Sequence, residues 1–243
     1  MRQRNGCTQL REKSSPVRQE RRLAQRQGRL LAFAALGLFA LSACGGGPIP
    51  STNYYKLHLP PPPAVQSSDP LPHTAVLLPL RASQMLTQDR IVYRPTQEEV
   101  GFYEYHRWAE DPRTTITNSV LDQLRQRGTF AQVSLFDGRT RGDYILRGSI
   151  DQLEEIDFGE GVSVHVRISL EAAEAESNKP VWQKTSEATA PVAAGEVRSV
   201  VSQMSAAATK TVEELVSGLD AFLRSNAAQR AAASPPLPPA AQK

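Results

Sequence analysis

Side chains able to do chemistry are few in this sequence, and they lie far apart. The histidines do not stand at metal-ligand spacings from one another; they are His58, His73, His106 and His165. The sequence has no Gly-x-Ser-x-Gly nucleophile motif and no phosphate-binding glycine loop. We therefore predict no catalytic residues, no metal site, no cofactor and no enzyme activity.

Carboxylates gather in a single stretch that contains Asp151, Glu154, Glu155, Asp157 and Glu160. Their spacing lacks the order of a calcium-binding loop, so we interpret them as the solvated end of a hairpin rather than as a cation site. In the strand predicted next, His165 alternates with valines. We interpret it as a surface residue.

The cysteine with the most informative surroundings is Cys44. An uncharged apolar run of twelve residues, from Leu30 to Leu41, precedes it behind an arginine-rich flank. A spanning helix needs about 20 apolar residues, whereas signal peptides use about 7–15. The sequence Leu-Ser-Ala-Cys that ends at Cys44 resembles the bacterial lipobox, whose cysteine sulfur receives a diacylglycerol. Cleavage then occurs just before the cysteine, and the new amino group is acylated, for example with palmitate.

Other interpretations of this segment differ in where the mature chain begins. A buried helix with an incidental cysteine is one alternative, but the run from Gly45 to Pro48 would end such a helix at once. The 29 residues before the apolar run are long for a signal-peptide flank. Two explanations stay open: translation starts near Val17, or the lipoprotein has a long leader.

Cleavage before Cys44 changes the charge of the protein. Residues 1–43 hold nine Lys/Arg and two Asp/Glu, a net charge of +7, against +3 for the whole chain, so −4 remains for residues 44–243. The basic balance belongs to the leader, and we predict no nucleic-acid partner. The mature chain keeps only one cysteine, the lipidated one. We therefore predict attachment to a membrane through the lipid anchor and no disulfide.

Composition divides the chain into four parts. Residues 1–43 are the predicted signal peptide, and residues 44–73 are the lipidated cysteine with a tether rich in glycine and proline. Residues 74–226 have the alternating patterns of one folded domain. Residues 227–243 form a tail rich in alanine and proline, which we expect to be disordered.

Hydrophobic periodicity predicts an α+β fold. Apolar or alternating segments indicate strands at residues 74–80, 90–94, 101–105, 131–136, 144–150, 161–170 and 181–189. The strands at 90–94 and 101–105 are separated by a polar loop that begins at Pro95, which predicts a hairpin. One helix begins after Asp111-Pro112 and ends at Gly128, and a long amphipathic helix covers about 196–225. We predict a two-layer sandwich in which a mostly antiparallel sheet has two main helices packed on one face.

Two short phrases contain the candidate docking residues. Tyr54 and Tyr55 lie in a stretch that has the character of a short strand. Arg107 and Trp108 lie where a predicted strand meets the capped helix. Trp and Arg are enriched at interface hot spots, which favours a docking surface. The alternative is structural: Trp108 covers the junction of sheet and helix, and Arg107 pairs with an acid.

The order of these features resembles a known family. It comprises the lipobox, "NYYKLHLP", "AVLLPL", "YEYHRWAEDP", "GDYILRGSI" and a long final helix. Over roughly residues 40–225 the chain is similar to the ABC-type transport auxiliary lipoproteins, which include the lipoprotein of the paraquat-inducible membrane-protein cluster. The Tyr-Tyr-x-Leu and Arg-Trp-Ala-Glu phrases are its more specific parts.

The resemblance implies a partner role rather than catalysis. Such lipoproteins accompany an ABC transporter with a substrate-binding protein of the MCE type, which moves lipids or other hydrophobic molecules across the cell envelope. Gly45 stands where enteric bacteria place an aspartate for retention at the inner membrane, which favours anchoring at the periplasmic face of the outer membrane. A homo-oligomer is compatible with the sequence. The alternative function is a structural or assembly lipoprotein for an outer-membrane protein.

Overall fold

The computed structural model describes residues 50–61, 69–193 and 196–233. Residues Ser51–Lys243 form one compact unit, distinct from Met1–Pro50. This unit has its own hydrophobic core, as expected of a segment that can fold by itself. Cys44, the predicted leader and the tail beyond Ala233 lie outside the described residues.

Within the described residues, nine strands form one mixed sheet. In chain order they are β1 (Asn53–Tyr55), β2 (Leu71–Leu77), β3 (Arg81–Ala82), β4 (Arg90–Arg94), β5 (Gly101–Trp108), β6 (Phe130–Leu135), β7 (Tyr144–Ile156), β8 (Ser163–Glu174) and β9 (Pro180–Pro191). A short 3-10 helix, η1 (Gln84–Thr87), precedes β4.

The central strand of the sheet is β7. It pairs in parallel with β2, β3 and β4, and antiparallel with β8, which pairs antiparallel with β9. The β4–β5 hairpin is antiparallel, as the sequence predicts, and β1 adds to β5 in parallel. The long β7–β8–β9 part is therefore the antiparallel sheet of the prediction, and the shorter strands around it make the whole sheet mixed.

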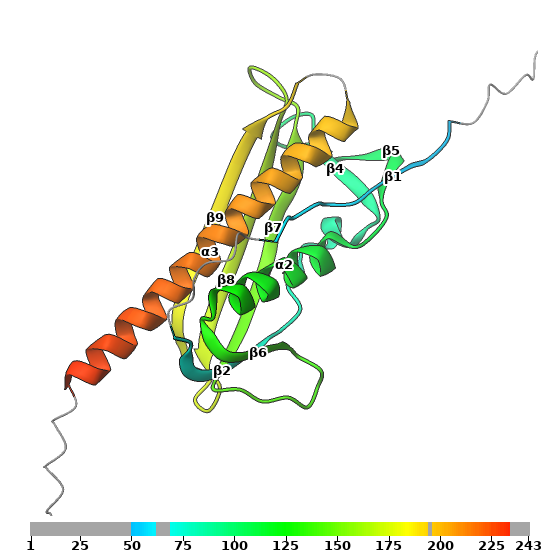
Figure 1. The fold of residues 1–243 in the computed structure, drawn as a ribbon. Helices are drawn as coiled ribbons and strands as arrows, with labels where there is room; N and C mark the ends of the chain where they lie inside the picture. Colours follow the sequence, from blue (N-terminus) through cyan, green and yellow to red (C-terminus); the bar gives the residue numbers. More distant parts are fainter. Residues whose placement is uncertain (1–49, 62–68, 194–195, 234–243) are drawn as a thin grey trace, which may run out of the picture. The chain divides into compact units, whose positions relative to one another are not determined.

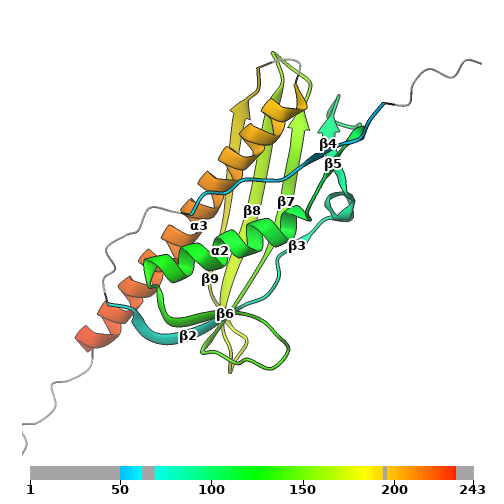
Figure 2. The ribbon, with the colours of Figure 1, turned by 45° about the vertical axis from the view of Figure 1, so that its right-hand side comes forward.

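Two helices, α2 (Pro112–Arg127) and α3 (Val197–Ala233), lie on the same side of the sheet (Figures 1 and 2). α3 packs on β8 and β9, while α2 packs on β6 and against α3. This arrangement confirms the predicted α+β class with both helices on one face.

Both ends of α2 follow from local sequence. Asp111 is the N-cap, and its Oδ1 accepts the backbone N–H of Arg113 at 2.9 Å. Pro112 occupies the first turn, where a missing N–H costs nothing. Gly128 ends the helix at φ +60°, a left-handed conformation that glycine adopts without strain. The predicted helix is confirmed.

Alternation along β8 explains why only one face is covered. The side chains of Val164, Val166, Ile168 and Leu170 are buried in the core. Between them, residues such as Arg167 and Ser169 lie on the opposite face. The apolar stripe of α3 closes the core over the first set, and its buried members include Val200, Met204, Ala208, Leu215, Leu219 and Leu223.

Several element bounds differ from the sequence expectations: β2, for example, begins at Leu71 rather than at residue 74, and both ends of the folded domain extend further than predicted. α3 ends at Ala233, eight residues beyond the predicted end at Ser225, because an alanine-rich sequence extends a helix at little cost. Residues 227–233, predicted above as part of the disordered tail, are therefore helical. Residues 53–60, assigned above to the tether, belong to the fold: β1 pairs with β5, and Leu57 is buried in the core.

Candidate docking site

A groove lies between the N-terminal segment and α3. After β1, the segment crosses from β5 to α3, as Figure 2 shows. The groove has a volume of about 740 Å³ and is lined by Tyr54, Tyr55, Lys56, His58, Pro60, Arg198, Val201, Ser202, Ser205, Ala206, Thr209, Lys210 and Glu213.

Strand pairing brings the four predicted docking residues together. In the β1–β5 register, Tyr54 is opposite Arg107 and Tyr55 is opposite Trp108. The backbone N–H of Ala109 donates to the carbonyl oxygen of Tyr55 at 2.7 Å. A short strand at the N-terminus thus acquires fixed neighbours about fifty residues away in the sequence.

Contacts with α3 fix the next part of the segment. The backbone N–H of His58 donates to Ser205 Oγ at 3.1 Å, and the Ser205 hydroxyl donates to the carbonyl oxygen of Val201 at 2.8 Å. Leu57, between these contacts and β1, is only 2 % exposed. One wall of the groove is therefore held by both backbone pairing and side-chain burial.

An aromatic cluster determines which tyrosine is available. The Tyr55 hydroxyl lies 2.9 Å from His106 Nδ1, within hydrogen-bond distance, and His106 stacks edge-on against Tyr103 with ring centroids 5.5 Å apart. Tyr55 is thereby engaged within the fold. Tyr54, by contrast, is 66 % exposed.

The predicted pair Arg107 and Trp108 divides between surface and core. Arg107 Nη1 donates to Asp89 Oδ2 at 2.7 Å, and this hydrogen bond raises the pKa of Arg107. Trp108 is only 7 % exposed and belongs to the hydrophobic core. Its ring is not presented to a partner, so the structural interpretation of this pair fits the geometry and Trp108 is removed from the docking surface.

Cationic groups without acidic partners face the groove from α3. Arg198 and Lys210 are exposed, and neither forms an ion pair within the described part of the chain. The other charges are engaged: Lys56 Nζ lies 2.6 Å from Glu110 Oε2, and Glu213 lies 3.9 Å from Arg127. The groove thus combines an exposed aromatic ring with unpaired positive charge, a composition suited to an acidic or polar protein surface.

Sequence reasoning missed the α3 wall of this groove. The sequence predicts a long amphipathic helix here, but it does not single out groove residues such as Ser205 and Lys210. No local pattern marks them, because the groove exists only once β1 has paired with β5. The available signal was the exposed polar face of α3 beside an N-terminal strand.

The acidic stretch is only in part the solvated hairpin end that we predicted: Asp157 and Glu160 are exposed between β7 and β8, whereas Glu154 and Glu155 are buried. Glu154 and Glu155 are 4 % and 5 % exposed. Glu154 Oε1 lies 3.5 Å from Arg94 Nη1, and Glu155 Oε2 accepts the Tyr103 hydroxyl at 2.8 Å. Burial raises the pKa of Glu155, although the Tyr103 hydrogen bond acts in the opposite direction. The strand β7 continues through these residues to Ile156 and carries them into the sheet.

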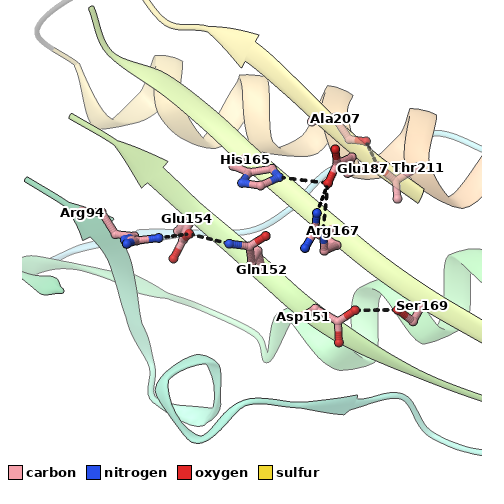
Figure 3. Close-up of polar contacts among 10 residues, drawn as sticks. All are labelled: Arg94, Asp151, Gln152, Glu154, His165, Arg167, Ser169, Glu187, Ala207 and Thr211. Carbon is pink, nitrogen blue, oxygen red and sulfur yellow. Dashed lines mark hydrogen bonds and ion pairs between the residues drawn. The ribbon is translucent and has the colours of Figure 1, made fainter. Parts of the chain in front are cut away.

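His165 lies on the face of the sheet opposite the helices, as predicted. It is half-buried, and its Nε2 is 3.7 Å from Glu187 Oε2 (Figure 3). Among the described residues, no group of three or more His, Cys, Asp or Glu side chains is placed to hold a metal ion. None of the helices described here combines the length and apolarity needed to cross a membrane.

Structural comparison establishes the fold. A Xanthomonas campestris protein of the DUF330 family superimposes with a TM-score of 0.61 at 17 % identity, over 72 % of this chain and 99 % of that one. More distant similarities include a PelC dodecamer subunit from Paraburkholderia phytofirmans (TM-score 0.42, 15 % identity, 65 % and 91 % coverage). Lipoprotein GNA1162 from Neisseria meningitidis gives a TM-score of 0.31 at 10 % identity, over 67 % and 100 % of the two chains.

Sequence comparison establishes the family. A search of curated proteins gives no significant match. The family described as "ABC-type transport auxiliary lipoprotein component" matches residues 55–216. This range begins at the last residue of β1, contains strands β2 to β9 and helix α2, and ends within α3. The chain belongs to the ABC-type transport auxiliary lipoprotein family.

Proposed function

We propose that this protein docks an MCE-type substrate-binding protein of an ABC transporter, and that this transporter moves lipids or other hydrophobic molecules across the envelope. The observation that carries the proposal is the extent of the family match. Residues 55–216 include every residue that lines the groove except Tyr54, which directly precedes the matched range. The docking surface would consist of Tyr54, Arg198 and Lys210, with Arg107 beside Tyr54 on β5.

A lipid at Cys44 would hold this groove close to a membrane. Because β1 is part of the fold, only residues 45–52 separate Cys44 from the first strand. At about 3.3–3.6 Å per residue, these eight residues span at most about 26–29 Å when fully extended. We assign the anchor to the periplasmic face of the outer membrane, because Gly45 is not the aspartate of inner-membrane retention.

Anchoring also changes the energetics of docking. A partner confined to the same narrow zone meets the groove at a high effective concentration, so a weak contact suffices. A surface of one exposed tyrosine and a few cations is consistent with such a contact. Mass spectrometry of the native protein would test the anchor: the expected N-terminus is Cys44 with its acyl chains, and an unmodified thiol there would refute it.

Photo-crosslinking tests the docking surface. A photoreactive amino acid replaces Tyr54 in the full lipidated chain, and crosslinked peptides are identified from intact membranes. We expect peptides of an MCE-type protein, and loss of the crosslink when Arg198→Glu and Lys210→Glu are added. The matched control places the same amino acid at Phe136, which is also exposed but distant from the groove lining. Equal crosslinks from both positions, or crosslinks only to outer-membrane assembly proteins, would contradict the proposal.

A further inference from the structure

A second cavity lies on the face of the sheet opposite the one that α2 and α3 cover. It has a volume of about 600 Å³, within the range of about 300–1,000 Å³ common for small-molecule sites. Strands β2 and β7 form its floor: Val76 and Ile145 are register partners whose side chains point away from core residues Leu77 and Leu146. The connection after β6 forms a wall through Phe136 and residues 140–142.

The floor of this cavity and the Phe136 part of its wall are apolar, while Thr140 and Arg141 make the rest of the wall polar. Val76 is 3 % exposed although it lies on the uncovered face, so it must be shielded by the β6–β7 connection that also lines the cavity. Leu78, Ile145 and Ala175 add further apolar surface. Phe136 lines the cavity and is still 46 % exposed. An exposed aromatic ring beside a shielded apolar floor favours a ligand with an apolar body.

Hydrogen bonds hold the connection in place. The backbone N–H of Phe136 donates to the Leu77 carbonyl at 2.9 Å, and Asp143 Oδ2 accepts the Thr74 backbone N–H at 2.7 Å. Asp137 Oδ1 accepts the backbone N–H groups of Arg139 at 2.9 Å and Thr140 at 2.7 Å. The cavity is therefore preformed, so a ligand does not need to order its wall.

The two arginines on the lining differ in whether they already have a partner. Arg147 is engaged, because its Nη2 lies 2.6 Å from Glu171 Oε1 and its Nη1 donates to Asn178 Oδ1 at 3.1 Å. Arg141 is exposed and has no acidic partner among the described residues. Glu176 is the one acid on the lining. The lining residues thus carry one net positive charge, with Arg141 available to an anion.

We propose that this cavity binds a small amphiphile with an anionic head group and an apolar chain, with Arg141 at the head and the Val76–Ile145 floor against the chain. This proposal is independent of the docking function, because none of the cavity residues lines the groove. Carboxylate and phosphate heads share the required chemistry, so the ligand is either a free amphiphile or a membrane lipid.

Titration calorimetry with dodecanoate below its micellar concentration tests the site, using residues 51–243. We expect saturable binding of dodecanoate and at least tenfold weaker binding of dodecyltrimethylammonium, whose head carries the opposite charge. Arg141→Ala should weaken dodecanoate binding about tenfold or more, the value of a charged hydrogen bond. Arg139→Ala, in the same connection but outside the lining, should leave binding unchanged.

Three further measurements test the same site in other ways. Ala175→Trp should fill the cavity and abolish binding while thermal unfolding stays cooperative, and Glu176→Gln should strengthen dodecanoate binding. Vesicles of phosphatidylglycerol then distinguish the source, because only a site that takes membrane lipid binds them in an Arg141-dependent way. Absence of dodecanoate binding, or equal binding of both head groups by wild type and Arg141→Ala, would overturn the proposal and leave the Tyr54 crosslink unaffected.

Discussion

The two faces of strands β7, β8 and β9 contrast sharply. On the face covered by α3, Val164, Val166 and Ile168 are completely buried. On the other face, the residues of β8 that alternate with these three are polar, and their side chains pair with residues of the neighbouring strands (Figure 3). The period of two in one strand therefore produces a packed core and a hydrogen-bonded surface from alternate residues.

The open face satisfies most of its own polar groups. Ser169 Oγ donates to Asp151 Oδ2 at 2.6 Å and lies 2.9 Å from Thr185 Oγ1. Arg167 Nε donates to Glu187 Oε2 at 2.8 Å. The groove beside β1 differs, because it leaves Arg198 and Lys210 without ion pairs among the described residues. Unpaired charge distinguishes a surface available to a partner from one already engaged with itself.

The largest loss of stability should come from a substitution in the core, on the face of the sheet that the helices cover. Trp108→Ala should lower the free energy of unfolding by about 3–5 kcal/mol, because it removes a large side chain from the core. Tyr54→Ala, in the strand paired beside it, should change stability by less than about 0.5 kcal/mol. Urea denaturation of both variants measures the difference. If Tyr54→Ala lowered the stability and Trp108→Ala did not, our assignment of Tyr54 to the surface and Trp108 to the core would be wrong.

Adjacent residues of β8 give the next comparison. Leu170→Ala should cost about 2–5 kcal/mol, because Leu170 is 1 % exposed in the core. Ser169→Ala loses only exposed hydrogen bonds and should cost about 1 kcal/mol or less. The two free energies of unfolding, measured under one condition, test the alternation directly. Equal costs at both positions would mean that the open face is also packed against something.

Much of the fold could be predicted because its patterns are local. The alternation of β8, the Asp111–Pro112 helix start and the left-handed Gly128 all follow from nearby residues, and the structure confirms each of them. The β4–β5 hairpin was predicted for the same reason. These features depend on spacing and on backbone preferences rather than on distant contacts.

Features that depend on distant pairing could not be predicted. The parallel addition of β1 to β5 places Tyr54 beside Arg107, but nothing in either segment specifies the partner. The burial of Glu155 has a related cause. A β-bulge between Ile150 and Gln152 shifts the alternation of β7, and Glu155 then lies opposite the buried Val164. The density of charge in this stretch favours a solvent-exposed position, while strand pairing places the Glu155 carboxylate on the core-facing side of the sheet.

Glu155 should make stability depend on pH. Burial raises its pKa, so the folded state keeps this proton to a higher pH than the unfolded state does. Stability should therefore fall as pH rises from about 4.3, the ordinary Glu value, through the folded-state pKa. Glu155→Gln should remove that part of the decline. The measurement is urea denaturation between pH 4 and 8.

Tyr103→Phe sharpens the same comparison. It removes the hydroxyl that donates to Glu155 at 2.8 Å and leaves a buried acceptor unsatisfied. We expect a loss of about 1–3 kcal/mol at pH 7 and a smaller loss at pH 4, where the carboxyl is protonated. Tyr105→Phe, two residues further along β5 and beside Glu104 rather than Glu155, is the matched control. A loss that does not depend on pH would mean that Glu155 does not carry the charge.

The smallest effect should come from the open face. Arg167 lowers the pKa of Glu187, so their pair stabilises the folded state above the ordinary Glu pKa and loses that contribution as pH falls. The resulting dependence of stability on pH is opposite in sign to the one expected for Glu155. Arg167 and Glu187 are 45 % and 55 % exposed, so water screens the pair, and 1 M salt shortens the screening length to about 3 Å. Arg167→Ala should therefore change stability less than Tyr103→Phe does, and the change should disappear in 1 M sodium chloride. A large effect that persists in salt would show that this face is shielded from solvent by a partner.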